Sequence, residues 1–128
     1  MNLFSYPVDE PFLLNVRKEV IYQVQRLQSH PSIVLWAGNN ENEGSLAGYI
    51  RPLPPAEQEA MKSDYRKLYI GTVMTTLLEI DPRGSRPFVG SSPSNGAESV
   101  QENYTAKNPQ DPLYGRKRIS FCENHLEI

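Results

Sequence analysis

The chain has 128 residues, enough for one domain with a hydrophobic core, and its 11 prolines indicate that loops take up much of it. A net charge of −2, with basic residues scattered until the short run Arg116 to Arg118, excludes the broad basic surface that nucleic-acid binding requires. The single cysteine, Cys122, excludes an internal disulfide and a metal site built from cysteines.

The N-terminal residues carry no recognisable targeting signal. Residues 1–7 lack both the basic start and the apolar stretch of a secretory signal peptide, and no part of the chain approaches the ~20 apolar residues of a membrane span. We therefore expect no membrane partner. The triplet Asn103-Tyr104-Thr105 would accept a glycan only in the secretory pathway, and such triplets are common by chance.

The first predicted elements are the end of a strand and a long helix. Residues 3–4 are apolar and lead into a loop. Acidic residues immediately before Pro11 are typical of the first turn of a helix. Apolar residues then recur at helical spacing from Leu13 to Leu27, which predicts an amphipathic helix from Pro11 to about Gln28.

The middle of the chain predicts a buried strand followed by a second long helix. Residues 32–36 contain the apolar run Ile33 to Leu35 and are too few for a helix, so we expect a strand buried on both faces, as parallel strands are. Small residues at 44–48 predict a single helical turn, and residues 51–55 form a proline-rich loop. A helix is predicted from about 56 to 80, and the proline and glycine within 81–84 end it.

The last elements complete an alternating pattern. Residues 86–91 predict a second short strand, 91–96 a polar loop and 97–104 a short helix, and no pattern continues past Lys107. The order is strand, helix, strand, helix, strand, helix, which is typical of an α/β fold with a parallel sheet.

Two polar segments follow the predicted strands. Asn39, Asn40 and Glu41 come after the strand at 32–36, and the polar loop at 91–96 comes after the next one. Active sites of α/β barrels and open α/β sheets lie at the carboxyl ends of the strands. These two segments are therefore the candidate site.

The pair Asn40-Glu41 has two interpretations. A carboxylic acid beside a glycosidic oxygen can protonate the leaving group and then activate water, and it needs apolar or aromatic walls such as Trp36 to raise its pKa. The amide of Asn40 could hold a sugar hydroxyl. Alternatively, Asn39 or Asn40 caps a short helix that carries Glu41 and Glu43 in its first turn. The spacing alone favours the cap.

A longer resemblance favours the first interpretation. The stretch HPSIVLWAGNNENE, residues 30–43, closely resembles the acid/base segment of the β-mannosidases of glycoside hydrolase family 2, and the likeness covers residues 19–43 and returns at 85–100. It is greatest to the animal lysosomal members. The resemblance implies a (β/α)8 TIM barrel, of which residues 1–115 would form about the third to fifth strands with their helices.

The resemblance also implies residue roles. Glu41 would be the general acid/base, and Asn40 would contact the 2-hydroxyl of a β-mannoside oligosaccharide. The reaction would be the retaining removal of terminal β-linked mannose from glycans in the lysosome, as part of glycoprotein catabolism, with no cofactor and no metal. Further candidates for contact with the sugar are Trp36, Asn39, Ser92 and Asn95, although Ser92 and Asn95 fit an ordinary turn equally well.

The chain departs from the family pattern in two respects. The nucleophilic glutamate of the family lies on a later barrel strand, beyond the length of this sequence, and residues 116–128 have no resemblance that we can identify. We therefore expect the chain alone to be inactive and the last segment to be an unrelated tail. Its open sheet edges would favour self-association. The alternative is a non-catalytic truncated isoform or an interaction module.

Overall fold

A computed structural model describes residues 6–81, 86–109 and 111. The predicted strand at 3–4, the stop signal at 82–84 and the tail at 116–128 lie outside these residues. The elements follow one another in the order α1 (Glu10–Leu27), β1 (Trp36–Ala37), α2 (Asn42–Ile50), α3 (Pro55–Leu68), the π-helix η1 (Tyr69–Met74), α4 (Thr75–Ile80), β2 (Phe88–Val89) and α5 (Ala97–Gln101). The described part is therefore mostly helical, with two short strands.

Helix α1 confirms the first predicted helix. The side chain of Asp9 accepts a hydrogen bond of 3.0 Å from the backbone nitrogen of Phe12, and this caps the helix at its N-terminus. The inner face of α1 packs against α4 and η1. Arg17 donates to the hydroxyl of Thr76 at 3.0 Å and forms an ion pair with Glu79 at 2.5 Å, so α1 and α4 are also joined by polar contacts.

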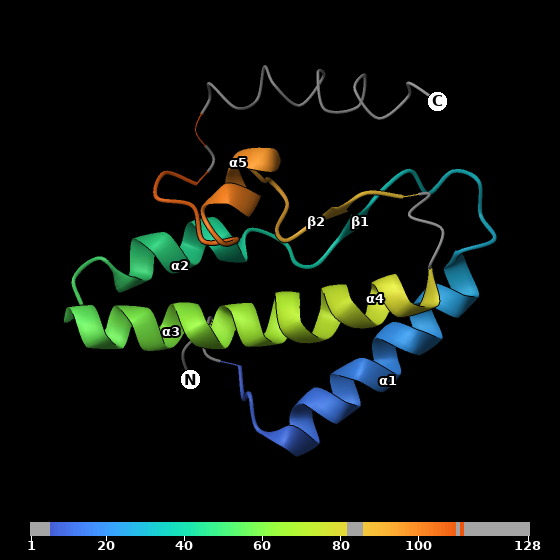
Figure 1. Cartoon of the computed structure of the whole chain (residues 1–128), viewed down its shortest axis with the longest axis horizontal. Coiled ribbons are helices and arrows are strands. Elements are labelled where there is room, and N and C mark those ends of the chain that lie inside the picture. The colour runs from blue at the N-terminus through green and yellow to red at the C-terminus, as the bar shows by residue number, and fades with distance from the viewer. Residues whose placement is uncertain (1–5, 82–85, 110, 112–128) are drawn as a thin grey trace.

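The second predicted helix is present as a continuous rod of α3, η1 and α4 (Figure 1). The π-helical turn was not predicted. Two threonine hydroxyls bond to carbonyls five residues earlier, Thr72 to Lys67 at 3.0 Å and Thr75 to Ile70 at 3.1 Å. At the π-helical turn between α3 and α4, where the helix widens, these backbone carbonyls therefore accept hydrogen bonds from threonine side chains.

The prediction of a doubly buried strand at 32–36 is wrong. Strand β1 contains only Trp36 and Ala37, and the side chains of Val34 and Leu35 are 72% and 43% exposed. An apolar run is buried only where neighbours cover it, and among the described residues the sheet has one other strand, β2. The predicted parallel pairing is confirmed, because Trp36 lies opposite Phe88 and Ala37 opposite Val89.

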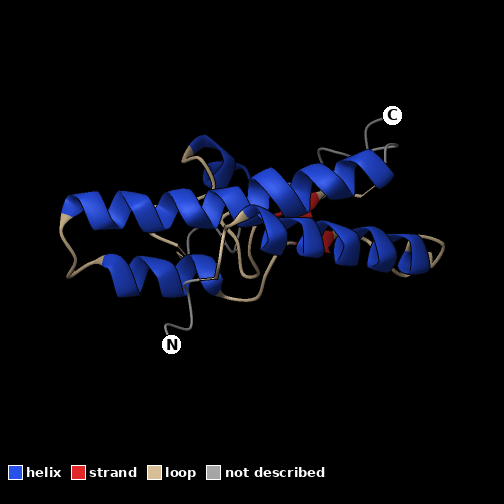
Figure 2. Cartoon of the chain, turned by 90° about the horizontal axis from the view of Figure 1, so that it is seen from below, coloured by secondary structure: helices blue, strands red, loops and turns tan. Residues whose placement is uncertain are grey.

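The rod and α1 lie on one side of the two strands. Figure 1 shows the rod running along β1 and β2 with α1 beyond it, and Figure 2, seen from below, shows α1 and the rod side by side with the strands behind them. Helix α2 is longer than the single turn that was predicted, since it has nine residues. It packs on α3 through a small core of Leu46, Ile50 and Tyr65.

Candidate functional site

The two polar segments that were predicted to follow the strands lie side by side. Asn40 and Ser92 form a parallel bridge immediately beyond the paired strands. The backbone nitrogen of Glu41 donates to the carbonyl of Ser92 at 2.9 Å, and the nitrogen of Ser92 donates to the carbonyl of Asn39 at 3.0 Å. The carboxyl ends of β1 and β2 therefore form one edge, and Asn40 and Glu41 lie on it.

Glu41 lies at the junction between this edge and helix α2. Its backbone is left-handed, with φ 60° and ψ 0°, and it occupies the N-cap position of α2. Its carbonyl accepts the backbone nitrogen of Ser45 at 3.0 Å, whereas its carboxylate makes no capping bond to α2. The side chain is exposed, so the described part of the chain leaves this carboxylate available to a ligand.

The side chain of Asn39 bonds to the first residue of α2, which agrees in part with the alternative interpretation, although Glu41 occupies the N-cap position and not the first turn. Oδ1 of Asn39 accepts a hydrogen bond of 3.1 Å from the backbone nitrogen of Asn42, the first residue of α2, and one of 2.7 Å from the hydroxyl of Ser91. Its Nδ2 donates to the carbonyl of Gly90 at 2.7 Å and to the hydroxyl of Tyr65 at 3.2 Å. Both ends of this amide are thus engaged within the protein.

Ser92 and Asn95, the two candidate residues in the polar loop at 91–96, differ in exposure. Ser92 is exposed beside Asn40, which is itself exposed. Asn95 is only 5% exposed, and its Nδ2 donates to the carbonyl of Asn108 at 2.9 Å. Its Oδ1 is buried without a hydrogen-bond partner among the described residues. Asn40, Glu41 and Ser92 therefore form the accessible part of the candidate site.

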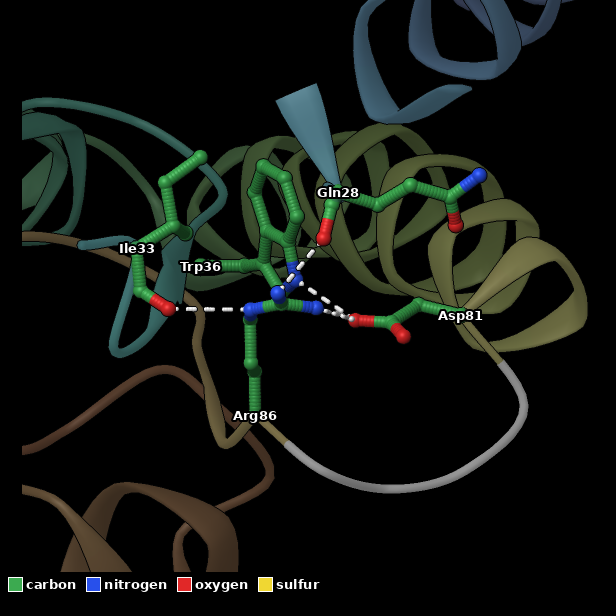
Figure 3. A network of polar contacts seen from close by, with 5 residues as sticks. All are labelled: Gln28, Ile33, Trp36, Asp81 and Arg86. Carbon is green, nitrogen blue, oxygen red and sulfur yellow. Dashed lines mark hydrogen bonds and ion pairs between the residues drawn. The ribbon is translucent and has the colours of Figure 1, made fainter. Parts of the chain in front are cut away.

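Trp36 lies at the opposite end of β1, in the polar cluster of Figure 3. Its indole nitrogen donates to Oδ2 of Asp81 at 3.0 Å, and the guanidinium of Arg86 lies 5.9 Å from the ring centroid. Arg86 also pairs with Asp81 at 3.1 Å and donates to the carbonyls of Ile33 at 2.9 Å and Gln28 at 2.6 Å. The cluster joins the ends of α1 and α4 to the strands.

Glu43 is an acidic residue whose burial was not predicted. Glu43, in the first turn of α2, is 4% exposed, and its Oε1 accepts the backbone nitrogen of Ala106 at 2.8 Å and the hydroxyl of Ser99 at 3.4 Å. Burial raises the pKa of this carboxyl above its ordinary value, although both hydrogen bonds act in the opposite direction. Glu43 thus attaches α2 to the segment around α5.

Two tyrosines lie next to the edge. Tyr65 is buried and Tyr69 is half-buried, and their ring centroids are 5.0 Å apart. Burial raises the pKa of Tyr65 and raises that of Tyr69 to about 12. The hydroxyl of Tyr69 accepts the side-chain nitrogen of Asn42 at 2.6 Å. The sequence analysis had no signal for these contacts, because each joins side chains more than 25 positions apart in the chain.

Helix α1 borders two further hollows among the described residues. Two open hollows, of about 510 and 350 Å³, lie along α1 and between α1 and the rod, and neither is lined by Asn40 or Glu41. Within residues 6–81, 86–109 and 111, no group of three or more His, Cys, Asp or Glu could bind a metal ion. Across the same residues, no helix is long and apolar enough to cross a membrane.

Comparison with known proteins identifies relatives for most of the chain. It is 44% identical over 110 residues to a β-mannosidase of Bos taurus and 46% identical over 110 residues to one of Capra hircus, matches that cover 86% of this chain and 12% of each relative. A β-mannosidase A of Emericella nidulans is 37% identical over 108 residues. No protein-family model matches. The chain is homologous to the β-mannosidases, and it spans about 12% of the length of these mammalian relatives.

Proposed function

We propose that this chain supplies the acid/base segment of a retaining β-mannosidase. In this proposal Glu41 is the general acid/base, Asn40 binds the 2-hydroxyl of a terminal β-mannoside, and Ser92 lies within reach of the same sugar. The segment belongs to a (β/α)8 barrel, acts in glycoprotein catabolism in the lysosome, and is followed at 116–128 by a tail outside the barrel.

One observation carries the proposal. Asn40 and Glu41 lie just beyond the carboxyl end of β1, a parallel strand, and are joined to the exit of the neighbouring strand through Ser92. Barrel enzymes place their catalytic groups at this end of parallel strands. The exposure of Glu41 and Asn40 is consistent with it, because a general acid has to reach a glycosidic oxygen.

The remaining candidates support the site in another way. The amide of Asn39 has two hydrogen bonds at each end, and Trp36 donates its indole N–H to Asp81. Asn95 is buried. We assign Asn39 and Asn95 to the framework around the strand exits and Trp36 to the polar cluster at the opposite end of β1, and none of the three to direct contact with the sugar.

We propose further that the 128 residues alone do not hydrolyse β-mannosides. A retaining mechanism needs a second carboxylate about 5–5.5 Å from the first, and a general acid needs walls that exclude water and raise its pKa. Glu41 is exposed in this chain, and the segment spans about 12% of the length of its mammalian relatives. Removing one group from a catalytic unit costs orders of magnitude in rate.

The experiment compares turnover of p-nitrophenyl β-mannoside by two proteins. One is the purified chain, and the other is a longer chain completed with the remaining segments of the Bos taurus relative. Each is tested unchanged, as Glu41→Gln and as the control Glu57→Gln, an exposed glutamate in the first turn of α3. We expect activity only in the longer chain, lost in Glu41→Gln and retained in Glu57→Gln.

Other outcomes would overturn separate parts of the proposal. Equal activity of the longer chain with and without Glu41→Gln would remove Glu41 from the acid/base role. If the isolated 128-residue chain is active and loses this activity in Glu41→Gln, the acid/base role of Glu41 is supported. The proposal that the 128 residues alone do not hydrolyse β-mannosides would then be wrong.

A second candidate role is association through the uncovered strand edge. Its motivation is the exposure of Val34 and Leu35, two apolar side chains that lead directly into β1. Unpaired strand edges readily pair with other chains. Sedimentation of the purified chain tests this role, and a monomer over a wide range of concentrations would argue against it.

A further inference from the structure

The accessible pair Asn40-Glu41 is flanked by two asparagines whose amides are held in the same manner. On one side, Nδ2 of Asn39 donates to the hydroxyl of Tyr65 at 3.2 Å. On the other side, Nδ2 of Asn42 donates to the hydroxyl of Tyr69 at 2.6 Å. Two tyrosines therefore hold the residues immediately before and after the exposed pair.

The two tyrosines form a rigid support. They are four residues apart along the continuous helical rod, Tyr65 in α3 and Tyr69 at the start of η1, and their rings are 5.0 Å apart at 55°. Tyr65 is 7% exposed and belongs to the core with Leu46 and Ile50 of α2. A ring fixed in this way can hold its hydroxyl in one place.

The backbone at Glu41 requires such support. A residue with a Cβ is disfavoured in the left-handed region, and Glu41 has φ 60°. Its N–H bond to Ser92 and the capping bond from Asn42 to Asn39 fix this turn from within. The hydroxyl of Tyr65 bonds to the side chain of Asn39, which accepts the capping bond, and the hydroxyl of Tyr69 bonds to the side chain of Asn42, whose backbone donates it.

We propose that Tyr65 and Tyr69 are positioning residues, which act through Asn39 and Asn42 to hold Asn40 and Glu41 at the strand exit. The catalytic meaning of this arrangement rests on the proposed function above. The conformational part does not, because it concerns how the turn is held and can be measured without turnover.

The test uses the full 128-residue chain labelled with ¹⁵N. The variants Tyr65→Phe and Tyr69→Phe, alone and combined, remove the hydroxyls and keep the rings. Tyr22→Phe makes the same change at a tyrosine that is 62% exposed on α1. Amide chemical shifts are measured for Asn40, Glu41 and Val24. Hydrogen exchange is measured for Glu41, whose N–H bonds to Ser92, and for Val24, which is buried in α1.

In the double variant we expect shifted amide signals at Asn40 and Glu41 and exchange of the Glu41 amide about tenfold faster, with Val24 unchanged. Tyr22→Phe should alter none of these signals. An unchanged Glu41 amide in a folded double variant would overturn the proposal. Equal acceleration at Val24 and Glu41 would overturn it as well, because the hydroxyls would then act only on global stability. Since neither readout depends on hydrolysis, a failed activity assay leaves this result interpretable.

Discussion

The indole nitrogen of Trp36 lies 3.0 Å from the carboxylate of Asp81, and this bond joins β1 to the residue that follows α4. Arg86 pairs with the same carboxylate oxygen and reaches two backbone carbonyls (Figure 3). A planar guanidinium can make such diverging contacts at once, whereas an ammonium group on a single stem cannot.

Replacing Arg86 by lysine should therefore destabilise the protein. The carbonyls of Ile33 and Gln28 would lose their donor in a partly buried place, at a cost of about 2 kcal/mol in the free energy of unfolding. Urea unfolding followed by the fluorescence of the single tryptophan, Trp36, measures the change. Arg26→Lys is the control, since Arg26 is exposed and bonds to the side chain of its helix neighbour Gln23. Equal effects of the two changes would contradict the role of Arg86.

Two glycines should respond in opposite directions to alanine. A Cβ on Gly38 would lie 2.8 Å from the carbonyl oxygen of Gly90 and 2.9 Å from the ring of Phe88, and Gly38 also bonds to Val89. The strands would have to move apart, so we expect Gly38→Ala to cost about 1–3 kcal/mol. Gly48 lies within α2 with nothing within 4 Å of its Cβ position. Gly48→Ala should stabilise by about 0.5–1 kcal/mol.

Thermal unfolding of both glycine variants checks these values. A stable Gly38→Ala variant would show that the two strand exits can separate without cost.

The buried carboxyl of Glu43 should make stability depend on pH. Its folded-state pKa is raised, so this group favours folding fully below its unfolded pKa, and that contribution is lost as the pH rises through the folded pKa. Glu43→Gln keeps an acceptor for Ala106 and does not titrate. The unfolding free energy of the unchanged chain minus that of Glu43→Gln should therefore fall as the pH rises over the range that begins near the ordinary pKa of a glutamate, about 4. A constant difference across this range would contradict the raised pKa.

Tyr65 and Tyr69 should titrate above the ordinary pKa of a tyrosine. Burial raises both pKa values, that of Tyr69 to about 12, so their protonated forms stabilise the fold below about pH 10 and this contribution disappears as the pH rises further. Phenolate absorbance of the folded chain measures the titration, and circular dichroism monitors folding. Tyr69→Phe should remove one late-titrating group, and loss of an early one instead would refute the assignment.

The helices were predictable because their signals are local. The capping residue Asp9 and the regular apolar spacing after it define α1 within one stretch of sequence. The rod α3–η1–α4 was found for the same reason, but its π-helical turn depends on hydroxyl-to-carbonyl bonds that spacing does not encode. The meeting of Asn40 with Ser92 was predictable from topology alone, since parallel strands end at one edge.

Burial was the property that the sequence could not specify. The run that ends at Leu35 is apolar and was predicted to be buried, yet Val34 is 72% exposed. Glu43 is polar and follows other polar residues, yet it is buried because Ala106, 63 positions later, supplies a backbone donor. In both places, contacts distant in the sequence decide whether a side chain meets water.

The bonds that assemble the strand exits also have a kinetic consequence. Those from Asn39 to Gly90, from Ser91 to Asn39 and from Ala106 to Glu43 join residues 51 to 63 positions apart. Helices need only local contacts, whereas contacts of this span must first close a long loop. The chain can therefore acquire most of its helical signal before Glu41 reaches its place. A normal far-ultraviolet spectrum does not by itself establish that the strand exits have assembled.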